Sequence, residues 1–119
     1  MKYLMLIKHA ESLRDEPFPE QFMPAMEQFM GGEFARRVIL DTAGLKPTKE
    51  ARRYRLGGNK VSVTDGPFAE TKELVGGFVM LVVDSTEEAE AFAEQFIALH
   101  RDNWPGLELE CELRAVEGV

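Results

Sequence analysis

An uninterrupted apolar run that passes directly into an amphipathic segment constrains the fold more than any other feature. Residues 75–83 contain no charged side chain, and such a run is typical of a strand that is covered by other structure. Ser85 follows, with Glu88 three residues later, which is the capping-box pattern that begins a helix. Four apolar residues then recur at helical spacing, namely Ala89, Phe92, Ala93 and Phe96. The pattern predicts a buried strand followed by a helix with one apolar face.

Other stretches carry equally regular patterns. Residues 2–9 alternate between two largely apolar faces, residues 38–45 form a short β-branched run closed by Gly44, and residues 107–115 alternate Leu and Cys with Glu and Arg. Each of the three predicts a strand. Apolar residues at helical spacing predict a first helix over residues 19–37. The glycine pair 31–32 inside it indicates either close packing against a neighbour or a weak point.

A hairpin is predicted in the middle of the chain. Residues 52–56 and 60–65 flank Gly57-Gly58-Asn59, and these turn residues supply the positive φ that tight hairpins require. The order strand, helix, strand, hairpin, strand, helix, strand predicts an α+β fold. We expect a ferredoxin-like split βαβ sandwich with the hairpin inserted, in one domain spanning residues 1–119.

A sheet with helices on one face leaves its other face to be covered. A second copy of the chain would cover it and form a dimeric α+β barrel, so we expect a symmetric homodimer. The residues predicted to lie on that second face are Tyr3, Met5, Ile7, Phe78, Met80 and Val82.

Composition narrows the function. The formal net charge of −7 disfavours binding to nucleic acid. The only cysteine, Cys111, cannot form a disulfide within one chain and is expected to be a packed thiol. Neither a signal-peptide pattern at the start nor a membrane-length apolar run is evident, so we expect a cytoplasmic protein without membrane contact. A P-loop, a dinucleotide glycine fingerprint and HExxH are absent from the sequence, so neither a cofactor nor a metal is expected.

The sequence TDGPFAETKE, residues 64–73, is unusual for a connection between two strands. A plain turn accounts for Asp65, Gly66 and Pro67, with Asp65 accepting backbone N–H groups. It does not account for the aromatic and ionisable residues that follow, and loops of this kind on a rigid sheet commonly carry function.

The same motif carries a resemblance. Together with MKYLMLIK at the start, AGLKPT before the hairpin and the second helix, it makes the whole chain resemble the YCII-related proteins of the DGPF type. The resemblance implies a dimeric α+β barrel, a bacterial cytoplasmic origin and a mostly uncharacterised activity. Some family members are similar to small enzymes with a histidine on the first helix and an aspartate after the second helix. Residues 19–37 contain no histidine, so that pair does not carry over.

The residues of the loop suggest a ligand-binding cleft. Phe68 would form an apolar wall, Glu70 and Thr71 would line the cleft, and Lys72 would hold an anionic group of the ligand. A carboxylate shielded by an aromatic ring has a raised pKa and can act as a general base. We therefore expect Asp65 to be a candidate catalytic base.

His9, at the end of the first strand, would assist this base as a proton carrier, although a hydrogen-bonded residue at a strand end is the simpler interpretation. His100 is expected to lie near the C-terminus of the second helix, partly protonated and without function.

Two alternatives remain open at this stage. The loop could be a dimer clamp, with Phe68 inserted into the other subunit. The chain could instead be a non-enzymatic interaction module whose acidic surface and basic hairpin dock a partner, such as the alternative sigma factors that the resemblance suggests.

Overall fold

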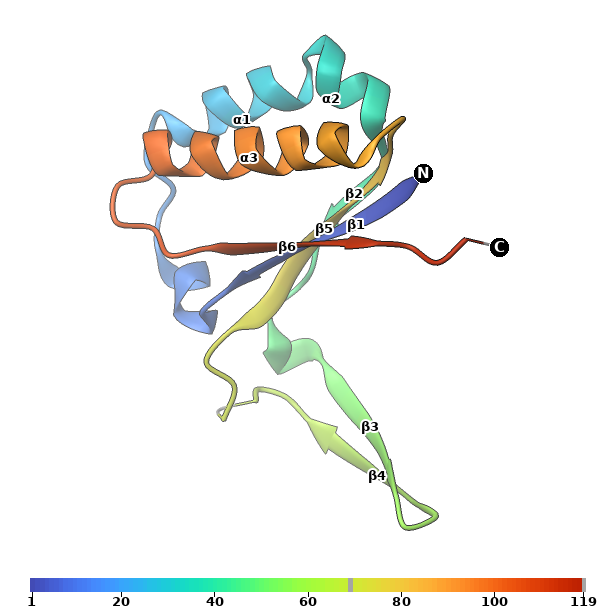
Figure 1. Ribbon diagram of the computed structural model, residues 1–119. Helices are drawn as coiled ribbons and strands as arrows, with labels where there is room; N and C mark the ends of the chain where they lie inside the picture. The colour runs from blue at the N-terminus through green and yellow to red at the C-terminus, as the bar shows by residue number, and fades with distance from the viewer. Residues whose placement is uncertain (69, 119) are drawn as a thin grey trace.

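The computed structural model describes residues 1–68 and 70–118. Figure 1 shows a sheet with all of its helices on one face and a separate two-stranded hairpin that extends away from both layers. The strands are β1 (Lys2–His9), β2 (Ile39–Gly44), β3 (Arg52–Gly57), β4 (Lys60–Asp65), β5 (Leu74–Val82) and β6 (Glu110–Ala115). The helices are α1 (Phe22–Met30), α2 (Glu33–Val38) and α3 (Thr86–Asn103), with short 3-10 turns η1 (Glu11–Asp15) and η2 (Thr48–Glu50).

The main sheet has the strand order β2-β5-β1-β6, with every neighbouring pair antiparallel. This is the ferredoxin-like order, in which two βαβ units interleave. Strands β3 and β4 lie between β2 and β5 in the sequence and form a separate two-stranded sheet. Positive φ at Gly58 and Asn59 closes their turn, as the sequence predicted. The predicted α+β fold with an inserted hairpin is therefore confirmed.

The first helix differs from its prediction. The apolar periodicity suggested one helix over residues 19–37, but the chain forms α1 and α2, with Gly31 and Gly32 between them. Gly32 is extended, with φ −74° and ψ 165°, so the helical backbone stops there. The change of direction lets α2 place Ala35 and Val38 in the core. The glycine pair is a break between two helices.

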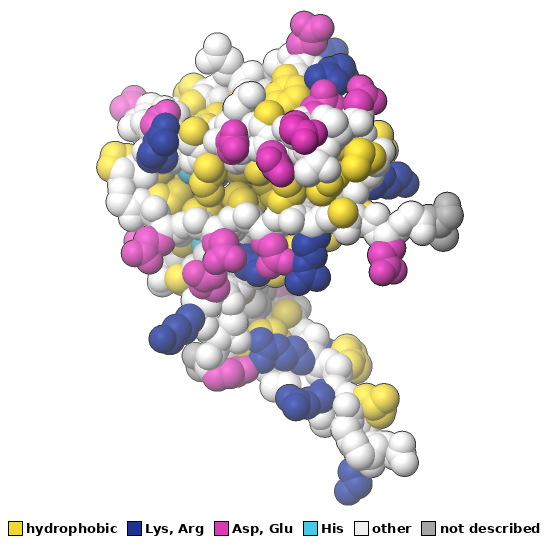
Figure 2. All heavy atoms as spheres, in the orientation of Figure 1, with side chains coloured by type: hydrophobic (Ala, Val, Ile, Leu, Met, Phe, Trp, Pro, Cys, Tyr) yellow, Lys and Arg dark blue, Asp and Glu magenta, His cyan; other side chains and the backbone are white. Residues whose placement is uncertain are grey.

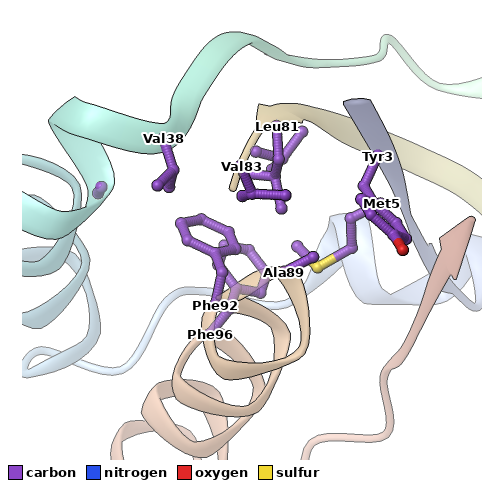
Figure 3. Packing of buried hydrophobic residues seen from close by; sticks show 10 residues of the cluster. Tyr3, Met5, Val38, Leu81, Val83, Ala89, Phe92 and Phe96 are labelled. Carbon is purple, nitrogen blue, oxygen red and sulfur yellow. The ribbon is translucent and has the colours of Figure 1, made fainter. Parts of the chain in front are cut away.

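The core lies between the helices and one face of the sheet (Figure 3). Phe92 and Phe96 of α3 point toward Leu81 of β5 and Val83 just after this strand, and Phe92 is fully buried. The Phe92 ring centroid lies 5.3 Å from that of Phe29 on α1. Helix α3 therefore supplies the aromatic layer that the sheet and the other helices enclose.

The prediction of which residues form the uncovered face of the sheet is correct only in part. Tyr3 is paired with Leu81, and Met5 with Val79, and because paired residues share a face all four lie against the helices. Leu4 and Leu6 of β1 are instead paired with Met80 and Phe78. The uncovered face is thus formed by Leu4, Leu6, Phe78, Met80 and Val82.

The last strand is shorter than predicted. Strand β6 begins at Glu110, so Leu107 and Leu109 precede it, but the predicted alternation holds within it. Cys111 packs against the core, and its burial raises the pKa of the thiol to about 11. The prediction of a packed, unreactive thiol is supported by this environment.

The overall shape is extended for a chain of this size. The radius of gyration is 16.3 Å, whereas a compact domain of the same length would have about 13.5 Å. The hairpin that projects from the body in Figure 1 accounts for this extension. Among the described residues, no helix combines the length and the apolar character needed to cross a membrane.

The cap of α3 gives a stability prediction. Ser85 accepts a hydrogen bond from the backbone N–H of Glu88 at 3.2 Å, and the Glu88 carboxylate accepts one from Asp84 N at 3.2 Å. Replacing Ser85 with Ala removes the first bond, and we expect the free energy of unfolding to fall by about 1 kcal/mol. Urea denaturation followed by circular dichroism measures it. The matched change Ser62→Ala, on exposed strand β4, should alter stability by less than about 0.5 kcal/mol, and an equal loss in both variants would contradict the cap assignment.

Candidate functional site

The loop between β4 and β5 is packed tightly against the turn η2 at its start. Gly66 donates its N–H to the carbonyl of Ala51 at 2.9 Å. A Cβ atom at Gly66 would lie 1.6 Å from the carbonyl oxygen of Thr48, so only glycine fits. The peptide bond from Gly66 to Pro67 is cis. The glycine of the DGPF sequence is therefore explained by a close approach of two backbone segments.

Arg53 of the hairpin holds the rest of the loop. Its guanidinium carbon lies 3.7 Å from the centroid of the Phe68 ring, which is a cation–π contact. The same guanidinium donates to Thr71 Oγ1 at 2.8 Å and forms an ion pair with Glu70. A backbone hydrogen bond and the Arg53 guanidinium hold the pKa of Glu70 below its usual value. Three of the predicted ligand-binding residues, Phe68, Glu70 and Thr71, are thus gathered around one arginine.

A cavity of about 300 Å³ lies beside this cluster. It is lined by residues from η1, η2, the hairpin, the loop and the start of β5: Glu11, Thr48, Arg53, Phe68, Thr71, Glu73, Leu74 and Val75. Oε1 of Glu11 accepts hydrogen bonds from the N–H of Thr48, at 3.2 Å, and from its hydroxyl. Oε2 of Glu11 is buried and has no partner among the described residues. The cavity therefore has an apolar wall at Phe68, and the Glu11 side chain in its lining carries one buried oxygen without a donor among the described residues.

The remaining predicted loop residues lie outside this cavity lining. Asp65 forms an ion pair with Arg52 at 3.0 Å, and both side chains are largely exposed. The two are also register partners across the hairpin, so this contact replaces the expected bonds to backbone N–H groups. Lys72 is exposed to solvent. The structure therefore brings neither Asp65 nor Lys72 to the cluster around Arg53.

His9 does not line the cavity beside Phe68, although its register partner Leu74 does. Its Nδ1 is 2.8 Å from the carbonyl oxygen of Ala10, which makes this nitrogen the donor. A Cβ atom at Gly76 would lie 1.9 Å from His9 Nε2, so the ring lies directly over that glycine. His9 lines a second cavity, which includes residues of α1 and α3. The structure thus places His9 and Asp65 in different sheets and in different surroundings.

Sequence reasoning missed several of the residues that build the loop site. Arg53 was considered only as part of the basic hairpin, although its position opposite Thr64 in the hairpin register brings it next to the DGPF sequence. Glu11 and Thr48 come from the short turns η1 and η2, whose sequences carry no periodic signal. Among residues 1–68 and 70–118, no three histidine, cysteine or acidic side chains converge as metal ligands do.

Known proteins share sequence similarity with a large part of this chain. The sequence pattern of the YCII-related domain matches residues 1–98. An uncharacterised protein from Rhizobium meliloti (strain 1021), R00369, is 45% identical over 51 residues. That match covers 43% of this chain and 41% of the length of the relative.

The role of Arg53 can be tested by its removal. In Arg53→Gln the cation–π contact and the ion pair are lost, so the pKa of Glu70 should rise toward its ordinary value. The amides of residues 68–73 should exchange with solvent roughly tenfold faster because the loop opens more easily. Carbon-detected NMR titration and hydrogen exchange measure the two effects. Arg55→Gln, two residues along the same strand, is the matched control and should change neither.

Proposed function

Because the chain belongs to the YCII-related family, we propose that it acts as a homodimer that binds a small polar molecule in the cavity beside residues 66–73. Family membership alone supplies no ligand, so the proposal rests on the geometry of the cavity. The acid–base pairing of Asp65 with His9 is not part of it, since their side chains lie in separate environments.

The buried Oε2 atom of Glu11 is the observation that carries the proposal. A buried carboxylate oxygen without a hydrogen-bond donor costs about 1–3 kcal/mol or more, and native proteins seldom retain such an atom without a reason. The atom belongs to a side chain that lines the cavity. In our proposal the Glu11 carboxyl group turns toward the cavity on binding, and an O–H or N–H group of the ligand supplies the missing donor.

The charges around the cavity indicate the chemistry of the ligand. Glu11 and Glu73 contribute carboxylates, whereas the Arg53 guanidinium is engaged by Phe68, Glu70 and Thr71. An anionic group would have to displace Glu70 from this arginine. A neutral or cationic molecule with hydroxyl or amino groups is therefore favoured over the anion that Lys72 was expected to hold.

The homodimer is supported by the surface that the single chain exposes. Its accessible area is 8414 Å², whereas a compact monomer of this mass has about 6,500 Å². The difference is larger than the roughly 800 Å² that each partner contributes to an interface of standard size. The uncovered sheet face around Phe78 and Met80 accounts for part of this excess.

The hairpin accounts for another part. Tyr54 is paired with Val63, and Leu56 with Val61, so the four apolar side chains share one face. Tyr54 is 69% exposed and Leu56 is 75% exposed. Figure 2 shows hydrophobic side chains on the projecting hairpin, apart from those of the main body. Since an isolated two-stranded hairpin is marginally stable in water, this apolar face is best explained as a contact with a second copy.

The same hairpin face supports a second candidate, an interaction module that docks a different protein. Such a partner could be a regulator of the sigma-factor type that the sequence suggested. The two candidates differ in the mass of the purified protein: the first requires a dimer of the chain alone, and the second requires a chain that stays monomeric until its partner is added.

The ligand proposal is tested by native mass spectrometry of protein purified without polyols or amines. We expect a retained small molecule, and we expect Glu11→Ala to lose it because the carboxylate that receives its donor is gone. Glu50→Ala removes a carboxylate from neighbouring η2 and is the control that should keep it. If no mass is retained, a thermal-shift series with glycerol and ethanolamine serves as the probe. No wild-type stabilisation by either compound would then contradict the proposal.

The dimer proposal is tested by placing charges on the hairpin. Tyr54→Lys with Leu56→Lys should weaken dimerisation by at least about a hundredfold, since two charges would have to be buried. Sedimentation equilibrium measures the dissociation constant. Ser62→Glu places a charge on the opposite face of the hairpin, where its register partner is Arg55, and should leave the dimer intact. A wild-type protein that sediments as a monomer at all concentrations would rule the dimer out.

A further inference from the structure

A second cavity, of about 270 Å³, lies on the helix side of the main sheet. Side chains from the end of β1, from η1, from the start of α1 and from the end of α3 with its following loop surround it. It shares no lining residue with the cavity beside Phe68. Whatever it binds is therefore separate from the ligand proposed above.

A buried histidine is the polar feature of this cavity. His100 is 7% exposed, and its Nδ1 lies 2.8 Å from the carbonyl oxygen of Phe96. A carbonyl oxygen only accepts, so Nδ1 carries the proton and Nε2 carries the lone pair. Burial lowers the pKa of His100, which keeps the ring neutral near pH 7. The sequence-based expectation of a partly protonated ring does not fit this buried position.

Nε2 of His100 is available to a ligand. Among the residues that the structure describes, it has no hydrogen-bond partner. It is also not one of the fully buried side-chain atoms that lack a partner, so part of its surface is accessible. His100 lines this cavity and an adjoining smaller one. A buried neutral imidazole thus presents one acceptor to open space, where a donor can reach it.

Aromatic rings form the walls around that acceptor. The ring centroid of Phe22 lies 5.0 Å from that of His100 and 5.0 Å from that of Trp104. Phe18 lies 5.3 Å from Trp104 in an edge-to-face arrangement, although it is 61% exposed. An exposed aromatic ring at the rim of an aromatic cavity offers a face that a planar ligand can cover.

The charged residues that line the cavity, Arg14 and Glu16, do not favour an anion. Arg14 lines the cavity, but its guanidinium donates to the carbonyl oxygens of Leu45 and Gly76, where it joins the ends of β2 and β5. Glu16 also lines the cavity and would repel an anion. A cavity of about 150 Å³ already suffices for benzene, so 270 Å³ admits a compound of one or two rings.

We propose that this cavity is a second binding site, for a small uncharged aromatic compound whose O–H or N–H donates to His100 Nε2. Its rings would stack among Phe18, Phe22 and Trp104. The ligand class is that of phenols and indoles, and it differs from the polar, donor-rich molecule proposed for the cavity beside Phe68.

Phenol is the probe, and toluene is its matched analogue without the donor. Trp104 is the only tryptophan of the chain and lines the cavity, so its fluorescence reports binding directly. We expect phenol to bind about two- to tenfold more tightly than toluene, the range of ratios that one hydrogen bond supplies. We also expect the ¹⁵N resonance of His100 Nε2 to shift on addition of phenol.

The variant His100→Phe keeps a ring in place and removes the acceptor. It should abolish the preference for phenol while toluene still binds, which a purely structural role of His100 would not produce. Thr71→Val, in the lining of the other cavity, should retain the preference, because the two cavities share no lining residue. Equal affinity of the wild type for phenol and toluene, an unchanged preference in His100→Phe, or no fluorescence response to phenol would each overturn the proposal.

Discussion

The contact of Arg53 with the loop after β4 is the interaction on which the rest of the candidate site depends. The guanidinium lies over Phe68 and binds Glu70 and Thr71, so one side chain of the hairpin sets the shape of one wall of the cavity. Gly66 fixes the start of the same loop against Thr48. The DGPF sequence is therefore best explained as the element that joins the hairpin, the turn η2 and the main sheet.

In our proposal this arrangement links ligand binding to assembly. The hairpin that carries Arg53 contacts little of its own subunit, and its apolar face around Tyr54 and Leu56 is exposed. A two-stranded hairpin of this kind gains order when its apolar face is covered. In our proposal a second copy covers it and so holds Arg53 in position. The cavity beside Phe68 would then be complete only in the dimer, whereas the cavity at His100 is built from the main body of one subunit.

The fold was largely predictable from the sequence because its elements carry strong periodic signals. The apolar run before Ser85 and the alternation after Glu110 both lie in the elements that they predicted. The errors arose where the periodicity of the sequence does not determine how an element is oriented in the fold. Tyr3 and Met5 alternate correctly, but alternation cannot say which face meets the helices, and only the pairing with Leu81 and Val79 does.

The candidate site was less predictable for a related reason. Phe68, Glu70 and Thr71 were identified from the loop itself, but the arginine that gathers them belongs to another strand. Glu11 was missed because its turn has no pattern, and its significance depends on the burial of a single oxygen atom. His100 was left out of the site because a helix C-terminus stabilises a partly protonated imidazole, whereas the packing of Phe22 and Phe96 against its ring encloses it. These are long-range contacts, which local sequence does not encode.

Amide hydrogen exchange of the wild-type protein, measured over a dilution series that crosses dimer dissociation, tests the central claim most directly. The account predicts that the amides of the hairpin and those of residues 66–73 lose protection together as the dimer dissociates, while those of α3 stay protected. Protection of residues 66–73 that persists after the hairpin has become unprotected would contradict it.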